Sequence, residues 1–77
     1  MENKRPRFYR SLTAEKIRNT MEAKGVRSSE LAASSGLTAK TIRRYMKGDV
    51  NMTLRSLFRI AFGLGCIIDD ILGVTWQ

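Results

Sequence analysis

Apolar side chains recur every three or four residues along most of the chain beyond residue 10, and glycines separate the apolar segments. The first segment predicts a helix over about 12 or 13 to 24, because Ile17 and Met21 lie four residues apart and share one helical face. Gly25 follows as a C-terminal stop signal. The polar residues expected to face water are Glu15, Lys16, Arg18 and Glu22.

Two short helices are predicted next, joined through a glycine. The second helix begins near 27–29 and ends at Gly36, whose tolerance of positive φ suits a tight turn. The third helix runs from 39 to 46 or 47 and ends at Gly48. Thr38 is placed to cap it, because a threonine hydroxyl can accept from the exposed amides of the first turn.

A fourth helix, capped by Thr53, carries the longest apolar stripe and is expected to be the central element of the core. Its apolar residues are Leu54, Leu57, Phe58, Ile60, Ala61 and Leu64. Gly65 ends this helix, and a last short helix around 68–72 is closed by Gly73. Five short helices with brief connections and no credible strand predict an all-α domain.

Residues 1–10 differ from the rest of the chain, because they are basic and have no apolar periodicity. We expect a flexible, extended basic N-terminal arm over 1–10 and a single folded domain over 11–77. A chain of 77 residues is too short to support two separate cores. Three cations of the arm, Lys4, Arg5 and Arg7, would follow the backbone of a nucleic acid or enter an adjacent minor groove.

The charge balance indicates a polyanionic partner. Fourteen Lys and Arg against seven Asp and Glu give a formal net charge of +7, which favours a nucleic acid. The alternative is that the charge only keeps a small protein soluble, so the placement of the charges has to decide, and the placement described below makes double-stranded DNA the expected partner. Catalysis is not expected, because the chain has no histidine to act as a general base. The single Cys66 excludes an intramolecular disulfide and a multi-cysteine metal site. We therefore expect a cytoplasmic protein with no enzyme activity, metal, cofactor or evident small-molecule ligand.

No membrane contact is expected either. The chain has no apolar run close to the roughly 20 residues that a spanning helix needs. A basic element lying on an anionic membrane would need large apolar residues beside its cations, and Phe8 and Tyr9 are the only candidates.

The segment 31–42 has the length and glycine position of a helix-turn-helix. Ala32 is small enough to let two helices cross closely, and Gly36 makes the turn between them. Leu37 and Ile42 would then fix the later helix against the earlier one. The spacing is typical of a DNA-binding unit, but it explains the fold rather than the partner.

The third predicted helix has one purely cationic face. Lys40, Arg43, Arg44 and Lys47 lie at i, i+3, i+4 and i+7, which places them within an arc of roughly 100°. The residues on the opposite arc are Ile42, Tyr45 and Met46. A merely solvated basic face usually carries Glu at i±4, and this helix has no acidic residue. The pattern favours contact with DNA.

Taken together, these segments resemble the phage repressor and Cro-like helix-turn-helix family, also called the xenobiotic response element family of bacterial regulators. The resemblance covers Ile17 to Leu72. The residues that carry it are Leu31-Ala32, Gly36, Thr38 through Ile42, Gly48, Leu57, Ile60-Ala61, Leu64-Gly65 and Asp70-Ile71-Leu72. It implies a lambda-repressor-like, five-helix helix-turn-helix domain that binds an operator, commonly as a two-fold dimer.

The resemblance also implies which residues contact DNA. The base-reading positions at the start of the third helix are Ala39, Lys40, Thr41 and Arg44. The resemblance implies phosphate contacts at the start of the second helix and around the start of the fourth. The cations that flank the base-reading line on the third helix are expected to contact phosphates as well. The expected backbone contacts are Ser28, Ser29, Thr38, Arg43, Lys47, Asn51 and Thr53. Met52 departs from the family's frequent proline, which leaves the contacts near Asn51 open.

Two functions remain open at this stage. The first is a sequence-specific transcriptional regulator, most simply a repressor. The second is a protein-interaction module of the same fold, such as an antitoxin or phage accessory protein. Residues 60–77 carry only Asp69 and Asp70 as charges, so this end is available for protein contact. Possible homodimer contacts, which could equally complete the core of the monomer, are Ile67, Ile68, Ile71, Val74 and Trp76.

Overall fold

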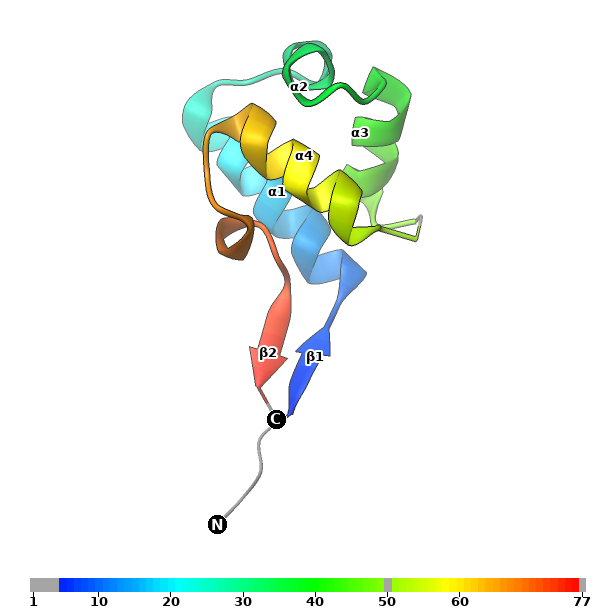
Figure 1. Cartoon of the computed structure of the whole chain (residues 1–77), viewed down its shortest axis with the longest axis vertical. Helices are drawn as coiled ribbons and strands as arrows, with labels where there is room; N and C mark the ends of the chain where they lie inside the picture. Colours follow the sequence, from blue (N-terminus) through cyan, green and yellow to red (C-terminus); the bar gives the residue numbers. More distant parts are fainter. Residues whose placement is uncertain (1–4, 50, 77) are drawn as a thin grey trace.

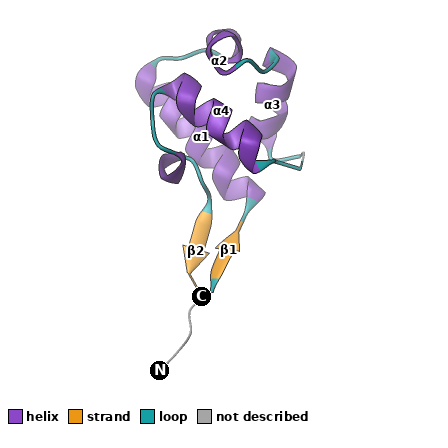
Figure 2. Ribbon diagram, viewed as in Figure 1, coloured by secondary structure: helices purple, strands orange, loops and turns teal. Residues whose placement is uncertain are grey.

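Four α-helices and a two-stranded ribbon make up the part of the chain that the computed structural model describes, residues 5–49 and 51–76 (Figure 1). The elements in chain order are β1 (Pro6–Phe8), α1 (Arg10–Lys24), α2 (Ser28–Ser35), α3 (Ala39–Lys47), α4 (Leu54–Leu64), the 3₁₀ turn η1 (Ile68–Asp70) and β2 (Val74–Trp76). The helices form one cluster, and both strands extend from one end of it (Figure 2). No helix in the described residues is both long and apolar enough to cross a membrane.

The core lies between the four helices and is closed by the segment after α4. The buried apolar residues are Ala14, Ile17, Met21, Leu31, Ile42, Tyr45, Leu57, Ile60, Ala61, Leu64 and Ile71. Both residues that marked the inner face of the first helix, Ile17 and Met21, are among them. Leu37, after the turn, is half-buried and packs against this core, as the sequence predicted.

Gly63 allows α2 and α4 to pack in close contact. A Cβ atom at this position would lie 2.8 Å from Ser34 Oγ and 2.9 Å from Leu31 Cδ1, both on α2. The Ser34 hydroxyl instead donates to the carbonyl oxygens of Gly63 and Leu31, each at 3.2 Å. A glycine that weakens α4 in isolation is therefore required by the helix beside it.

The prediction of an all-α domain is wrong, because β1 pairs with β2. The two strands are antiparallel, with Arg7 opposite Thr75 and Phe8 opposite Val74. Each strand has three residues, and the pairing joins opposite ends of the chain, so neither strand has a local sequence signal. Residues 6–10 are consequently not a free arm: they include β1 and the first residue of α1, which starts two or three residues earlier than expected.

The junction between ribbon and helices is a close contact of Gly73 with the first turn of α1. The amide of Gly73 donates to the Thr13 hydroxyl at 2.8 Å, and its carbonyl oxygen accepts from the amide of Tyr9 at 2.8 Å. Thr13 is fully buried although it is polar. These two bonds fix the separation at which β1 and β2 leave the helices.

The prediction of a fifth helix is also wrong, because the segment contains only the single 3₁₀ turn η1. The Asp70 carboxylate accepts from the amide of Ile67 at 3.3 Å and closes the turn on itself. Gly73, three residues after this turn, contacts the first turn of α1. The segment between η1 and Gly73 is therefore too short for a further helical turn. Ile71 fills the core at 0% exposure without belonging to a helix.

Two residues predicted for the core of the fourth helix lie on its outer face. Leu54 is 60% exposed and Phe58 is 53% exposed. The buried face is narrower than the apolar pattern suggested, and it consists of Leu57, Ile60, Ala61 and Leu64. The sequence could not separate the two groups, because α4 is apolar around more of its circumference than the core can cover.

Candidate nucleic-acid interface

The cationic face of α3 points away from the core. Ile42 and Tyr45 are buried at 0% and 4% exposure, and they hold the inner side of the helix. The four cations on the outer side are all exposed; they are Lys40, Arg43, Arg44 and Lys47. The structure therefore confirms the predicted amphipathic helix, with an apolar inner face and a cationic outer face. A helix held by one face and cationic on the other can enter the major groove of B-DNA.

Thr38 caps α3 as predicted and also orients Thr41. Its hydroxyl oxygen accepts from the amide of Thr41 at 3.1 Å and donates to the Thr41 hydroxyl at 2.9 Å. Both hydrogen-bonding roles of Thr38 therefore serve the helix start, and a phosphate contact through this hydroxyl would compete with the cap. The Thr41 hydroxyl, which is the acceptor in this pair, keeps its own proton for an outside acceptor.

The C-terminal end of α3 is held by two contacts that the sequence did not reveal. The Arg18 guanidinium, on α1, donates to the carbonyl oxygen of Met46, where a cation also complements the helix dipole. The Tyr45 hydroxyl accepts from the amide of Thr53 at 3.4 Å, which ties α3 to the start of α4. Arg18 is exposed, as expected, but no spacing within α1 indicates its partner.

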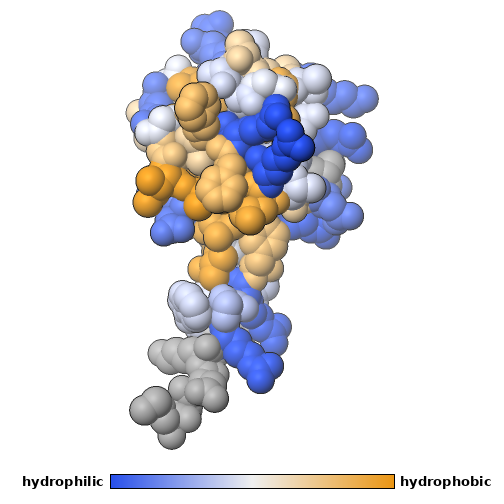
Figure 3. All heavy atoms as spheres, in the orientation of Figure 1, coloured by the Kyte–Doolittle hydropathy of each residue, from blue (hydrophilic) through white to orange (hydrophobic). Residues whose placement is uncertain are grey.

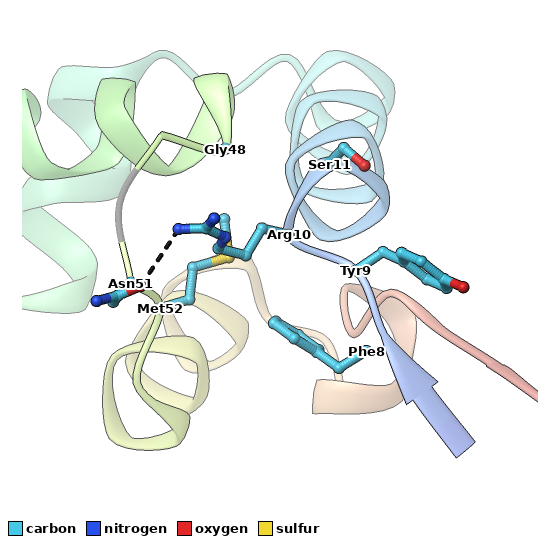
Figure 4. Close-up of a pocket in the computed structure, with 7 residues that line it drawn as sticks. All are labelled: Phe8, Tyr9, Arg10, Ser11, Gly48, Asn51 and Met52. Atoms are coloured by element: carbon cyan, nitrogen blue, oxygen red, sulfur yellow. Dashed lines mark hydrogen bonds between the residues drawn. The ribbon is translucent and has the colours of Figure 1, made fainter. Parts of the chain in front are cut away.

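Arg10 reaches the loop after α3 and adds a cation to the predicted site. Its Nη1 donates to Asn51 Oδ1 at 3.2 Å (Figure 4). The two side chains lie in an open hollow of about 570 Å³. Its lining residues are Phe8, Tyr9, Arg10, Ser11, Gly48, Asn51 and Met52. Because Asn51 accepts from Arg10 through its carbonyl oxygen, its NH₂ group remains able to donate to a phosphate.

The start of α2 offers a weaker anion site than the sequence suggested. The Glu30 carboxylate accepts from the amide of Arg27 at 2.9 Å and so places a negative charge in the first turn. Ser29 is exposed, whereas Ser28 is half-buried. A phosphate at this end would meet the serine hydroxyls and amides but also the Glu30 charge.

The start of α4 is capped in the predicted way. The Thr53 hydroxyl oxygen accepts from the amide of Ser56 at 3.1 Å. Since this bond uses the oxygen only as an acceptor, the hydroxyl proton of Thr53 can still donate to a phosphate.

Two basic residues of the N-terminal segment lie at the ribbon, Arg7 within β1 and Arg5 directly before it. Both are exposed, and within β1 Arg7 alternates with Pro6 and Phe8, so its side chain points to the opposite face of the ribbon. Hydrophilic side chains gather beside β1 and over α3 on the same side of the molecule (Figure 3). Lys4, the third predicted arm cation, lies outside the described residues.

The proposed homodimer contacts separate into accessible and inaccessible residues. Ile67 and Trp76 are 65% and 66% exposed. Ile68 and Val74 are half-buried. Ile71 is fully buried in the protomer's own core, which is the alternative role that the sequence left open for these residues.

Residues 5–49 and 51–76 contain no group of three or more His, Cys, Asp or Glu side chains that could hold a metal ion. Burial raises the pKa of the Cys66 thiol, the Asp70 carboxylate raises it further, and Lys24 opposes both. A thiol with a raised pKa is a poor nucleophile at neutral pH.

Comparison with known proteins agrees with this geometry. The sequence model of the Cro/C1-type HTH DNA-binding domain matches residues 16–75. The restriction-modification controller protein C.AhdI from Aeromonas hydrophila superimposes with a TM-score of 0.77 at 22% identity, over 80% of this chain and 94% of that chain. At this identity the likeness concerns the fold alone.

Two further structures are somewhat closer in sequence. The wild-type restriction-modification controller protein C.Esp1396I is 28% identical, with a TM-score of 0.72 and 74% of each chain covered. The hypothetical transcription factor NHTF from Neisseria is 25% identical, with a TM-score of 0.77 over 82% of this chain and 72% of that chain. The comparison with curated proteins gave no match.

Proposed function

The chain belongs to the Cro/C1-type helix-turn-helix family of DNA-binding domains, and on this premise we propose that it represses transcription by occupying an operator. In this proposal α3 lies in the major groove and a two-fold dimer spans two half-sites. The helices supply the groove contact, and Arg5 and Arg7 of the basic N-terminal segment add contacts beside it. Repression of this kind requires only occupancy of the site, with no catalytic step.

The observation that carries the proposal is the outer face of α3. Its four cations are exposed, and the helix contains no acidic residue to neutralise them. Like charges at i+3 and i+4 repel one another, so this arrangement costs stability in the isolated protein. A polyanion relieves that repulsion, and B-DNA supplies phosphates on both sides of a groove wide enough for a helix.

We assign base reading to the start and middle of α3. Arg44 donates two parallel bonds to O6 and N7 of one guanine, and Lys40 donates to the same acceptors of a neighbouring base pair. The methyl groups of Ala39 and Thr41 meet thymine methyl groups. The hydroxyl proton that Thr41 retains gives it a second, polar means of contact.

Phosphate contacts flank this reading line on both sides. Arg43 and Lys47 extend toward the DNA backbone along α3, and further donors come from neighbouring elements. These further donors are Ser28, Ser29, Asn51 and Thr53. Arg10 joins them through its bond to Asn51. Thr38 contributes by holding the helix start, because its hydroxyl is engaged in the cap.

The test of the proposal is selection of bound sites from random duplex DNA with the purified full chain. A dimer that reads two half-sites should select a pseudo-palindrome whose halves lie about 34 Å apart, one helical turn. If the selected duplexes share no common sequence, the protein does not bind DNA sequence-specifically. That outcome is expected for a protein-interaction module of the same fold.

Binding is predicted to weaken steeply with salt. Some five to eight cationic side chains per protomer can reach the duplex, and each neutralised phosphate contributes about −0.9 to the slope of log K against log salt. Titration of the selected duplex at several salt concentrations measures this slope. A nearly flat dependence would show that the exposed cations of α3 do not contact phosphate.

The basic side of the ribbon is predicted to contribute to that slope. Replacing Arg5 and Arg7 together by Ala should reduce it by about one to two units, because a phosphate contact is lost with each guanidinium. The matched control is Lys24→Ala, which removes one positive charge beside Cys66 and Asp70, away from α3. An unchanged slope in the double variant would leave the ribbon outside the interface.

A further inference from the structure

The outer face of α4 carries a line of large apolar side chains. Leu54, Phe58 and Phe62 lie four residues apart and are 60%, 53% and 81% exposed, so they form one stripe along the helix. The core does not need them, because the opposite face of α4 already closes it. Apolar side chains gather over α4 on the face of the molecule shown in Figure 3, with hydrophilic side chains beside them.

The stripe lines a shallow hollow where α4 passes the end of α2. The volume of this hollow is about 550 Å³. It is lined by Ser35, the last residue of α2, and by Leu54, Arg55, Phe58, Arg59 and Phe62 of α4. A hollow along the side of a helix accepts another helix, because the side chains of one helix pack into the groove beside the ridge of the other.

The charged residues that line the hollow are both cationic. Arg55 and Arg59 are exposed, and α4 contains no acidic residue. Arg59 also lies against the turn between α2 and α3, because a Cβ atom at Gly36 would lie 3.2 Å from its Nη1 atom. The hollow therefore offers a strip of apolar side chains with two guanidinium groups beside it.

We propose that this hollow binds an acidic amphipathic helix of another protein. The apolar residues of that helix, at positions i, i+4 and i+7, cover Leu54, Phe58 and Phe62. Asp or Glu residues that flank its apolar face pair with Arg55 and Arg59. The inference goes beyond the proposed function and does not depend on DNA binding.

The stripe is large enough for the centre of a small interface. A fully exposed phenylalanine presents roughly 200 Å², so Phe58 and Phe62 at 53% and 81% exposure together present about 270 Å². That is about a third of the roughly 800 Å² that each partner contributes to a stable interface. Leu54 adds to this area, and the two arginines provide a polar rim.

The charge of the hollow favours an acidic partner over the other occupants. Two copies of the chain packed through this face would bring two arginines from each α4 into one interface, with no carboxylate from either α4 to pair with them. DNA offers phosphates to the arginines but no comparable apolar surface to the phenylalanines. A helix on an anionic membrane turns its main apolar face to the lipid, whereas α4 turns its own into the core.

The experiment is a selection of displayed helical peptides on the purified full chain. The peptides have roughly 15 residues, about four helical turns, with Leu fixed at i, i+4 and i+7 and with Glu, Gln or Lys allowed at the flanking positions. The selected peptides should carry Glu at those positions. Selection of Lys-rich peptides, or of none, would overturn the proposal.

An aromatic substitution locates the selected peptide on the chain. Phe62→Ala should weaken its binding by about 10-fold or more, since residues at the centre of an interface dominate the binding energy. The variant keeps the net charge of +7, so it separates the hollow from a general attraction of acidic peptides. Trp76→Ala is the matched control: it removes an aromatic side chain of similar exposure, 66%, from the ribbon, and should leave binding unchanged. Circular dichroism confirms that both variants fold.

A charge reversal tests the pairing with the arginines. Arg59→Glu should weaken binding of the Glu peptide by about 10-fold or more. The same variant should bind a version of the peptide with Lys in place of Glu more tightly than the wild-type chain does. Lys24→Glu makes the same change of charge beside Cys66 and Asp70 and should have a small effect, about 2-fold, because salt screens distant exposed charges. Equal effects of the two reversals would overturn the pairing.

The remaining outcomes identify a different occupant. A wild-type dimer that Phe62→Ala dissociates would show that a second copy covers the hollow, and it would overturn the proposal. Binding to phosphatidylglycerol vesicles that is lost in Phe62→Ala, with no peptide selected, would assign the surface to a membrane instead. These measurements contain no DNA. A chain that selects a DNA site but no acidic peptide therefore retains the proposed function and loses this inference, and the reverse result retains only the inference.

Discussion

Arg44→Ala is expected to weaken binding to the selected operator by about 5- to 150-fold, which corresponds to about 1–3 kcal/mol. The Arg44 guanidinium is exposed on the outer face of α3, where it can donate two parallel bonds to one guanine. Loss of this pair should also relax the preference at one base position. Binding measured at fixed salt on the selected site and on its single-base variants shows both effects.

Two neighbours on the same helix provide the control for Arg44. Arg43→Ala and Lys47→Ala remove one exposed charge each and should weaken all sequences about equally, because a phosphate contact carries no base identity. Each should also reduce the salt slope by about one unit. Equal losses on every base variant for Arg44→Ala would show that Arg44 holds a phosphate, and the assigned reading face would then be wrong.

Gly73→Ala is expected to destabilise the fold by about 3 kcal/mol, at the upper end of the usual cost of overpacking. A Cβ atom at this position would overlap the backbone nitrogen of Thr13 and lie 2.8 Å from the carbonyl carbon of Leu12. These are backbone atoms of α1 and cannot rotate away. For a domain of this size the melting temperature should fall by roughly 15 °C, which thermal unfolding followed by circular dichroism measures.

Gly25→Ala is the matched control for Gly73→Ala. Gly25 has a φ of 65°, and a Cβ atom there would meet nothing within 4 Å. The substitution should cost only the strain of a left-handed alanine, about 1 kcal/mol. Similar losses for the two variants would show that the contact between Gly73 and α1 is not tight in solution.

The sequence by itself determined the helix-turn-helix and the orientation of α3. Caps and stop signals act within one helical turn, so Thr38 and Thr53 fixed the starts of α3 and α4 as predicted. The 3.6-residue period then separated buried Ile42 and Tyr45 from the exposed cations of α3. These features are local, because each depends on residues that are neighbours along the chain.

Only the tertiary structure decided which residues far apart in sequence meet. The Arg10–Asn51 bond joins residues 41 positions apart, and the Gly73–Thr13 bond joins residues 60 positions apart. The three-residue strands of the ribbon pair next to that second contact, where the two ends of the chain lie side by side. The sequence also could not determine which apolar residues of α4 are buried, because this helix has more of them than the core can cover. Phe58 was expected in the core and is exposed. Periodicity identifies the faces of a helix, but the neighbouring elements decide which face is covered.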